Sequence, residues 1–437
     1  MVAPEEYAHM QLVAPESVGL SSKRLEKMSS WMERQVSSNR LAGLSAMIHR
    51  RGQCAYFNCT GQMDIEAGKA MAEDTIFRLY SMTKPITAVA AMICYEDGYF
   101  QLDDPIAKFL PEFAEMQVWD GNPSALSMVP AEGYITVRHL MTHTAGFSYE
   151  FMEASPVEAF YREHKISFNP GRQTEGRANL SAMTTRLAQA PLVRQPGSGW
   201  GYSVSIDVLG RLVEVWSGEP LDRYFEERIF QPLGMVDTAF SVVAEKQERF
   251  AACYEPTSGG GLSGLSSQAA VIRKSEGIGL KLSDAPPDSH YLEMPETFSG
   301  GGGLTGTIGD YGRFCQMLLN KGELAGVRIL GSKTVEFMSV NHLPNNKDMA
   351  AMGQKLWSES SAEGIGYGLG MAVVIDAATT QLIRSTGEFF WGGAASTAFW
   401  IDPAENMFVV FMTQLVPSTF YPIRSELRVT AYQALID

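Results

Sequence analysis

Short segments typical of β-strands lie near both ends of the chain, whereas the middle has the periodicity of helices. Near the N-terminus, residues 44–49 and 55–60 flank Arg51-Gly52-Gln53, which indicates two strands joined by a tight turn. Near the C-terminus, short strands are predicted at residues 369–375, 382–384, 396–401 and 408–413. The turn-rich residues 402–406 separate the last two strands and favour an antiparallel arrangement. We therefore expect both ends of the chain to contribute to one sheet.

A helix is predicted beside the strands at each end of the chain. After Ser21 and Ser22, either of which can cap a helix, apolar residues recur at helical spacing as far as Ser37. A closing helix is predicted at residues 421–435. The predicted fold class is α/β (α+β), an antiparallel sheet flanked by helices.

The middle of the chain is predicted to form a second, mainly helical lobe. Helical patterns are found at residues 137–142, 183–190, 206–216 and 221–229. With 437 residues, the chain exceeds the roughly 250–300 residues at which one hydrophobic core stops growing. We expect an α/β lobe from residues 1–102 and 299–437, a helical lobe from 103–298, and an active site in the cleft between them.

The charge of the chain argues against nucleic acid and membrane surfaces as partners. Asp and Glu total 49 against 35 Lys and Arg, a net charge of −14, which repels phosphate groups and anionic lipids. Residues 1–7 include Glu5 and Glu6 where a secretory signal would carry basic residues, and no long apolar block follows them. The sequence therefore predicts a cytoplasmic protein without a membrane span.

No pattern indicates a metal or a cofactor. His139 and His143 are spaced like two metal ligands on a helix, but Leu140 stands where H-E-x-x-H has its glutamate. The glycine-rich stretches at residues 258–261 and 300–303 are not followed by the Gly-Lys-Ser/Thr of a phosphate-binding loop. The five cysteines are scattered without a C-x-x-C pair, as is typical of buried packing residues. We expect no metal and no cofactor.

Ser81 and Lys84 form a Ser-x-x-Lys motif immediately before the apolar run at residues 88–93. On a helix that begins near Ser81, the two side chains would share one face, with Cβ atoms roughly 5–6 Å apart. A serine hydroxyl is a poor nucleophile until a neighbouring base takes its proton, and a helix N-terminus favours negative charge. The motif alone is weak, because it arises by chance and also fits a capped helix with a surface lysine.

Further motifs make the chain resemble class C β-lactamases, low-molecular-weight penicillin-binding proteins and the related esterases. Beyond residues 77–84, the matching stretches are residues 102–105, 109–111, 139–146, 196–197 before Tyr202-Ser203, 232–235, 300–304 and 367–370. They occur in the order of the family and span nearly the whole chain. The resemblance implies a β-lactamase-like fold, with Ser81 as nucleophile and Lys84 as base.

The second family element, a tyrosine followed two residues later by asparagine, is altered here. Tyr202 is kept, and the resemblance implies that it shares the proton with Lys84 and passes it to the leaving group. Val204 replaces the asparagine that normally holds the side chain of a β-lactam. We therefore expect Val204 to be part of the substrate-binding site of an enzyme poor at cleaving lactams.

The third family element, usually Lys-Thr-Gly or His-Thr-Gly on an edge strand, is replaced by Trp391-Gly392-Gly393. These three residues are predicted to bind substrate, and their sequence resembles the family VIII carboxylesterases. Tryptophan cannot anchor a carboxylate as lysine does, so an uncharged ester with an apolar part is expected. The resemblance also implies an oxyanion hole formed by the backbone N–H groups of Ser81 and Ala394.

The sequence thus predicts a serine carboxylesterase that hydrolyses small, short-chain esters through an acyl-enzyme on Ser81. One alternative is a β-lactamase, a D-amino-peptidase or an acyltransferase on the same scaffold, because the serine, lysine and tyrosine are shared. Another is a non-catalytic binding or filament-forming member. The G-x-S-x-G signature of α/β-hydrolases does not occur in the chain.

Overall fold

The computed structural model describes residues 11–152, 154–168, 178–258, 277–353 and 362–437 of the chain. The N-terminal residues 1–7 and most of the first glycine-rich stretch, residues 259–261, lie outside these described residues.

Among the described residues, the largest sheet has eight strands, in the order β12-β13-β14-β15-β16-β1-β2-β3, with antiparallel pairing throughout. Its strands are β1 (Gly43–Arg50), β2 (Gln53–Asp64), β3 (Lys69–Ala70), β12 (Ile365–Tyr367), β13 (Ala372–Val374), β14 (Phe389–Gly392), β15 (Ala398–Asp402) and β16 (Met407–Thr413). β1 pairs with β2 on one side and with β16 on the other. As expected, the two ends of the chain build one sheet.

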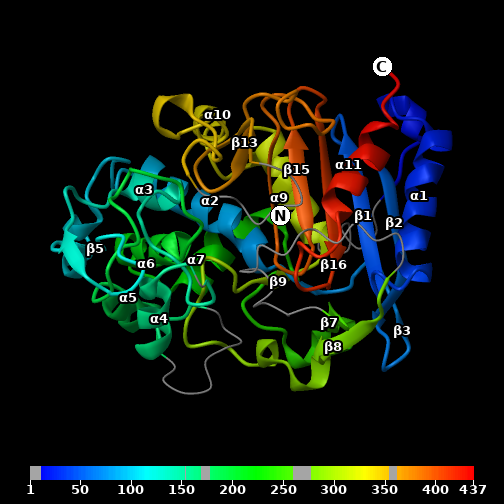
Figure 1. Cartoon of the computed structure of the whole chain (residues 1–437). Helices are drawn as coiled ribbons and strands as arrows, with labels where there is room; N and C mark the ends of the chain where they lie inside the picture. The colour runs from blue at the N-terminus through cyan, green and yellow to red at the C-terminus, as the bar shows by residue number, and fades with distance from the viewer. Residues whose placement is uncertain (1–10, 153, 169–177, 259–276, 354–361) are drawn as a thin grey trace.

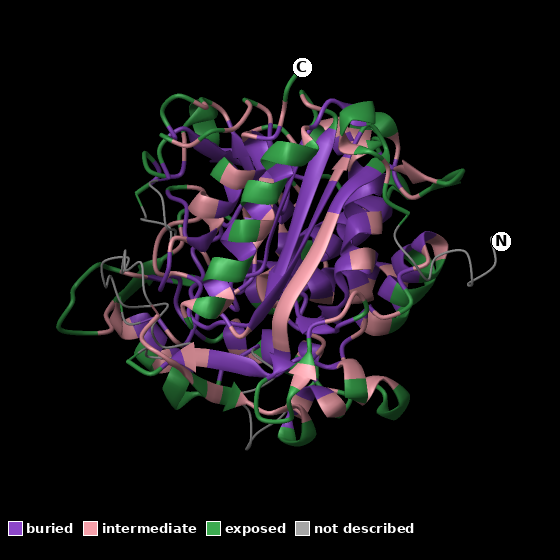
Figure 2. Cartoon of the chain, turned by 90° about the vertical axis from the view of Figure 1, so that its right-hand side faces the viewer, coloured by how far each residue is buried: buried purple, intermediate pink, exposed green. Residues whose placement is uncertain are grey.

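Helices cover both faces of this sheet. α1 (Ser22–Ser37) and α11 (Ile423–Tyr432) pack on one face, where they share a core with Ala46 and Ile48 of β1. α9 (Ile308–Leu319) lies against β1, β15 and β16 on the other face, and Met47 belongs to the core on that side. Successive side chains of β1 point to opposite faces of the sheet, so this strand contributes apolar side chains to the core on each side. Figure 2 shows the central strands of the sheet buried, a long strand beside them only half-buried, and helices whose outer faces are exposed.

The helices of the middle segment gather to one side of the sheet, at the left of Figure 1. They are α3 (Val137–Met141), α4 (Pro156–Glu163), α5 (Leu180–Leu187), α6 (Ser205–Ser217) and α7 (Leu221–Phe225), which continues as a π-helical turn (Glu226–Phe230) and α8 (Gln231–Leu233). α2 (Thr83–Glu96) runs between this group and the sheet, and α10 (Ser332–Met338) lies near β13.

The short strand pairs are β4 (Phe77–Arg78) with β9 (Thr305–Gly306), β5 (Gln117–Trp119) with β6 (Met128–Pro130), β7 (Cys253–Pro256) with β8 (Leu280–Asp284), and β10 (Glu323–Leu324) with β11 (Val327–Arg328). The lobe boundaries expected from the sequence stay a prediction.

The strand predicted at residues 382–384 is wrong. The N–H of Leu382 donates to Thr380 Oγ1, and this hydroxyl donates to the carbonyl of Ala377, so the segment forms a local turn. Side-chain bonds of this kind compete with the strand ladder for backbone groups. The strand of the sheet comes later, as β14, and includes Trp391 and Gly392.

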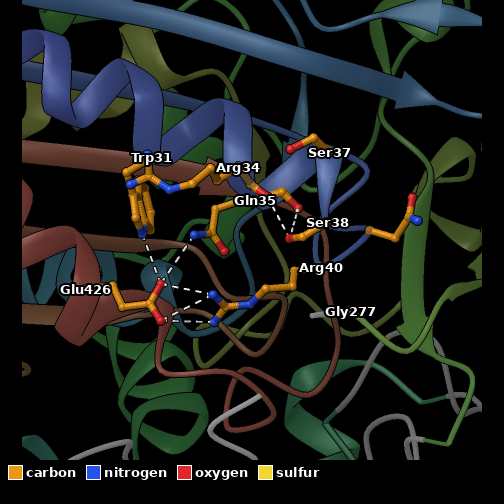
Figure 3. A pocket seen from close by; sticks show the side chains of 9 residues that line it. Trp31, Arg34, Gln35, Ser37, Ser38, Arg40, Gly277 and Glu426 are labelled. Atoms are coloured by element: carbon orange, nitrogen blue, oxygen red, sulfur yellow. Dashed lines mark hydrogen bonds and ion pairs between the residues drawn. The ribbon is translucent and has the colours of Figure 1, made fainter. Parts of the chain in front are cut away.

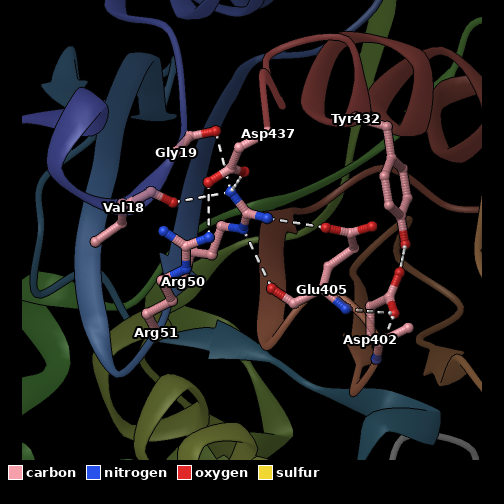
Figure 4. A network of polar contacts seen from close by, with 9 residues as sticks. Val18, Gly19, Arg50, Arg51, Asp402, Glu405, Tyr432 and Asp437 are labelled. Carbon is pink, nitrogen blue, oxygen red and sulfur yellow. Dashed lines mark hydrogen bonds and ion pairs between the residues drawn. The ribbon is translucent and has the colours of Figure 1, made fainter.

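A buried arginine at the end of β1 ties the two chain ends together (Figure 4). Arg50 donates to the carbonyls of Val18 at 2.9 Å and Gly19 at 3.0 Å, and forms ion pairs with Glu405 at 2.9 Å and with Asp437. These contacts hold the N-terminal and C-terminal segments side by side, as the pairing of β1 with β16 requires.

A cavity of about 730 Å³ lies between α1 and α11 (Figure 3). Arg40 at its wall donates several hydrogen bonds to Glu426, at 3.2 Å. Its lining residues are Trp31, Arg34, Gln35, Ser37, Ser38, Asn39, Arg40, Gly277 and Glu426. None of the residues predicted to act on a substrate is among them.

Candidate active site

Ser81 lies in a tight turn that leads into α2. β4 pairs with β9, and the chain then forms a 3₁₀ turn at Tyr80–Met82 before α2 begins at Thr83. Tyr80 has a φ of +46°, a left-handed conformation that is uncommon for a bulky residue. Lys84 is in the first turn of α2, so the two motif residues face one another across the start of the helix, close to the sequence prediction.

The side chains of Lys84 and Tyr202 both contact the hydroxyl of Ser81. Lys84 Nζ is 3.2 Å from Ser81 Oγ, and the Tyr202 hydroxyl donates to the same oxygen at 2.6 Å. Lys84 is fully buried, whereas Ser81 and Tyr202 are only half-buried. The three predicted catalytic residues therefore meet at the hydroxyl of Ser81, a residue that is only partly buried.

Tyr202 is positioned by the loop that precedes α6. The N–H of Gly201 donates to the carbonyl of His143 at 2.8 Å, and the N–H of Val204 donates to that of Ser148 at 3.2 Å. The ring of His143 packs 4.9 Å from the ring of Tyr202, and burial lowers the pKa of this histidine well below its usual value. The neutral imidazole ring of His143 thus packs against the ring of Tyr202 and helps to hold it in place.

The side-chain nitrogen of Lys84 is enclosed by a carbonyl and two aromatic rings. Lys84 Nζ donates to the Gly301 carbonyl at 2.6 Å and lies 4.6 Å from the centre of the Tyr202 ring. The Tyr149 ring, whose centre is 5.6 Å from the same nitrogen, closes another side. Gly301 and Tyr149 were not expected from the sequence as contacts of Lys84. These contacts orient the lysine toward Ser81.

Asp207 holds the loop that contacts Lys84, and sequence reasoning missed it. Its Oδ1 accepts hydrogen bonds from Ser299 Oγ at 2.5 Å and from the Gly301 N–H at 2.9 Å. Burial raises the pKa of this carboxyl group, although the charge of Lys84 and both hydrogen bonds act in the opposite direction. The available signal was an acidic residue inside the apolar pattern of the helix at residues 206–216.

Trp391 and the two glycines after it lie beside the Ser81 turn. Trp391 is 8% exposed, and its ring is 5.5 Å from the Tyr202 ring and 5.4 Å from the Tyr367 ring. A Cβ atom on Gly393 would lie 2.4 Å from the carbonyl oxygen of Leu79, so only glycine permits this close approach. The structure thus brings the third predicted element next to the first. Ala394 follows in the turn after β14 and is half-buried.

Val204 does not line the site, contrary to the sequence prediction. Its side chain is fully buried in the main hydrophobic core, at the start of α6. An apolar side chain at this position gains more by packing into the core than by facing solvent. The valine therefore removes the polar group expected from the family pattern without replacing it by a substrate contact.

The two spaced histidines have structural surroundings. His139 Nδ1 accepts a hydrogen bond from the N–H of Thr136, which caps α3 in return. Within the described ranges, no three His, Cys, Asp or Glu side chains are grouped so as to hold a metal ion. The helices described here also include none that is long and apolar enough to cross a bilayer.

Comparison with known families identifies the scaffold. A family model described as Beta-lactamase matches residues 28–433, a span that includes Ser81, Lys84, Tyr202 and Trp391. The chain belongs to the beta-lactamase family. The resemblance inferred from the sequence motifs and the predicted fold class are thereby confirmed.

Relatives within the beta-lactamase family include esterases and acyltransferases. Esterase EstB of Burkholderia gladioli is 31% identical over 387 residues, which cover 89% of each chain. Monacolin J acid methylbutanoyltransferase of Aspergillus terreus is 27% identical over 408 residues, covering 89% of this chain and 90% of the transferase. The solved structure of EstCE1, a hydrolase with promiscuous acyltransferase activity, has a TM-score of 0.74 at 28% identity and covers 96% of this chain and 99% of EstCE1. This beta-lactamase-family protein is accordingly a serine hydrolase in the broad sense.

Proposed function

We propose that the protein is a carboxylesterase of the family VIII type that hydrolyses small, short-chain esters through an acyl-enzyme on Ser81. The observation that carries the proposal is the convergence of Lys84 Nζ and the Tyr202 hydroxyl on Ser81 Oγ, at 3.2 and 2.6 Å. A nucleophile in contact with a base and with a second proton-transfer group is the arrangement that acyl transfer requires.

Acylation begins when Ser81 Oγ attacks the ester carbonyl carbon. Lys84, in its uncharged form, takes the proton of the hydroxyl as the new C–O bond forms. The negative charge that develops on the carbonyl oxygen is bound by the N–H groups of Ser81 and Ala394. The bond to the alcohol oxygen then breaks, and Tyr202 passes a proton to this oxygen so that a neutral alcohol leaves.

Deacylation repeats these steps with water. The water attacks the acyl carbon, its proton moves to the Tyr202 and Lys84 pair, and the bond to Ser81 Oγ breaks. The serine regains its proton and the carboxylic acid is released. No metal or cofactor takes part in the proposed reaction.

The surroundings of the site favour esters over β-lactams. Trp391 stands where lactam-cleaving relatives carry a lysine or histidine, so no cation from this position meets a lactam carboxylate. Its ring instead belongs to an aromatic group with Tyr202 and Tyr367. Such rings favour an uncharged substrate with an apolar acyl or alcohol part.

Hydrolysis of a panel of p-nitrophenyl esters from acetate to octanoate, with nitrocefin in parallel, tests the proposal. We expect the short esters to be hydrolysed fastest, nitrocefin to be a poor substrate, and Ser81→Ala to lose ester hydrolysis. Most of the activity remaining in Ser81→Ala, or a preference for nitrocefin, would refute it.

Acyl transfer to an alcohol is a second candidate, because named relatives include an acyltransferase and a hydrolase with acyltransferase activity. It uses the same acyl-enzyme and differs only in the acceptor of the acyl group. Adding a primary alcohol and measuring the new ester against the free acid distinguishes the two. An excess of ester at low alcohol concentration would favour the transferase.

A further inference from the structure

A side chain from the far end of the chain reaches the turn that carries the proposed oxyanion donor. Arg424, near the start of α11, donates from one guanidinium nitrogen to the carbonyl of Gly393 at 2.7 Å and to that of Thr397 at 3.0 Å. Gly392 leaves room for this approach, because a Cβ atom there would lie 2.7 Å from Arg424 Cζ. The arginine is half-buried.

The carbonyl of Gly393 and the N–H of Ala394 belong to the same peptide unit. Val416-Pro417 is the cis bond found in the described residues, so this peptide is trans. In a trans peptide, the C=O and N–H bonds point in opposite directions within one plane. A hydrogen bond that fixes the direction of the Gly393 carbonyl therefore also fixes the direction of the Ala394 N–H.

The turn around this peptide is held at both ends. The N–H of Gly393 donates to the Thr397 carbonyl at 3.0 Å, and the N–H of Ser396 donates to the Gly393 carbonyl at 3.2 Å. Arg424 binds both of these acceptor carbonyls, so its guanidinium joins the two sides of the turn. A charged donor on the carbonyl also polarises the amide and strengthens its N–H as a donor.

We propose that Arg424 is a positioning residue for the oxyanion hole, which aims and polarises the Ala394 N–H by binding the Gly393 carbonyl. The inference rests on the proposed function, because it assigns a reason for the geometry of a donor that the acyl-transfer mechanism requires. Arg424 acts through the peptide and is not expected to touch the substrate. Its effect should therefore be largest where the oxyanion exists, in the tetrahedral transition state.

The experiment compares Arg424→Lys, Arg424→Gln and Arg424→Met with wild type in p-nitrophenyl butyrate hydrolysis. Concentrations are corrected for active enzyme by complete labelling with a fluorophosphonate, and folding is checked by thermal unfolding. Inhibition by phenylboronic acid, which forms a tetrahedral adduct with a reactive serine, reports on the oxyanion hole. Arg223→Gln is the matched control, because that side chain is 63% exposed on α7.

We expect kcat of the Gln and Met variants to fall about 10- to 100-fold, less than the loss of a whole oxyanion donor typically costs. KM should change by less than about threefold, and the inhibition constant of the boronic acid should rise in parallel with the loss of kcat. Arg424→Lys keeps the charge but not the planar guanidinium, so its kcat should lie between those of these two variants and that of wild type. Arg223→Gln should behave like wild type.

The proposal is overturned if the Met variant keeps kcat within about twofold of wild type, or if kcat falls while boronate affinity is unchanged. If the Met variant fails to fold, the kcat and boronate affinity of the Lys variant are judged by the same two criteria. Loss of activity in Ser81→Ala together with unimpaired Arg424 variants would refute the inference and leave the proposed function standing. Ester hydrolysis that survives in Ser81→Ala would instead refute the proposed function.

Discussion

The side-chain nitrogen of Lys84 donates a 2.6 Å hydrogen bond to the carbonyl oxygen of Gly301. The N–H of the same glycine donates to the buried carboxyl group of Asp207 at 2.9 Å. One residue of the glycine-rich segment thus connects the proposed base with a buried acid on α6. The position of the lysine beside Ser81 depends on contacts that lie far from it in the sequence.

Asp207→Asn should lower activity without lowering stability. Asparagine can accept the same two hydrogen bonds but lacks the charge that strengthens them, so the Gly301 carbonyl should hold Lys84 beside Ser81 less firmly, and we expect kcat to fall about tenfold, the equivalent of roughly 1.4 kcal/mol. Burial raises the pKa of Asp207, so its ionisation destabilises the folded protein as pH rises through that pKa. The melting temperature of the variant at pH 8 should therefore equal or exceed that of wild type. An unchanged kcat would contradict this account.

Gly301→Ala should be far more disruptive than Gly302→Ala. A Cβ atom at residue 301 would lie 2.3 Å from Asp207 Oδ2, whereas at residue 302 the nearest atom would be the Tyr80 carbonyl carbon at 3.8 Å. Overpacking a buried site costs about 1–3 kcal/mol, and an unhindered substitution changes the free energy of unfolding by less than about 0.5 kcal/mol. Urea unfolding of both variants measures the difference. Equal losses would show that the contact with Asp207 is not what requires a glycine.

Trp391→Phe should weaken the binding of aryl esters more than it slows their turnover. Phenylalanine keeps an apolar ring near Tyr202 and Tyr367 but removes part of the surface beside the proposed site. We expect KM for p-nitrophenyl butyrate to rise about three- to tenfold, the cost of losing one or two buried methylene equivalents. Steady-state kinetics on the purified variant measure both constants. A fall in kcat with unchanged KM would contradict a substrate-binding role.

His49 should make the protein less stable in acid. Burial lowers the pKa of this histidine in β1 from 6.5 to about 4, and its ring stacks on Phe408 at 4.6 Å. The neutral ring makes its full contribution to the free energy of unfolding above pH 6.5. This contribution is lost as pH falls toward 4, because the unfolded chain then binds more protons than the folded protein. Between pH 7 and 4.5, wild type should lose about 2 kcal/mol relative to His49→Gln. Parallel pH profiles of urea unfolding for the two proteins would contradict the prediction.

The sequence predicted those parts of the fold that depend on local pattern. Ser21 caps α1 as expected, and the strand before Arg51-Gly52-Gln53 forms within one residue of the predicted bounds. The strand after it also forms, but it begins at Gln53 and continues to Asp64, beyond the predicted residues 55–60. The strand at residues 382–384 failed because the hydroxyl of Thr380 competes for the backbone N–H of Leu382, a side-chain choice that hydrophobicity does not record.

The parts of the site that sequence reasoning missed all depend on distant contacts. Ser81 and Lys84 are three residues apart, so helix geometry alone placed them together. Asp207 and Arg424 contact residues 301 and 393, respectively, which lie 94 and 31 positions away along the chain. Val204 was assigned to the substrate-binding site from its position in a motif. A motif comparison cannot tell whether a replaced residue still faces the substrate.

A covalent acyl group on Ser81 is the most direct test of the central claim. The enzyme would be mixed with p-nitrophenyl butyrate, quenched in acid within milliseconds, digested and analysed by mass spectrometry, with Ser81→Ala treated in the same way. The account predicts a butyryl group on the peptide that contains Ser81 in wild type and none on the matching peptide of the variant. An acyl group on another residue, or rapid hydrolysis by wild type with no acyl group on Ser81, would contradict it.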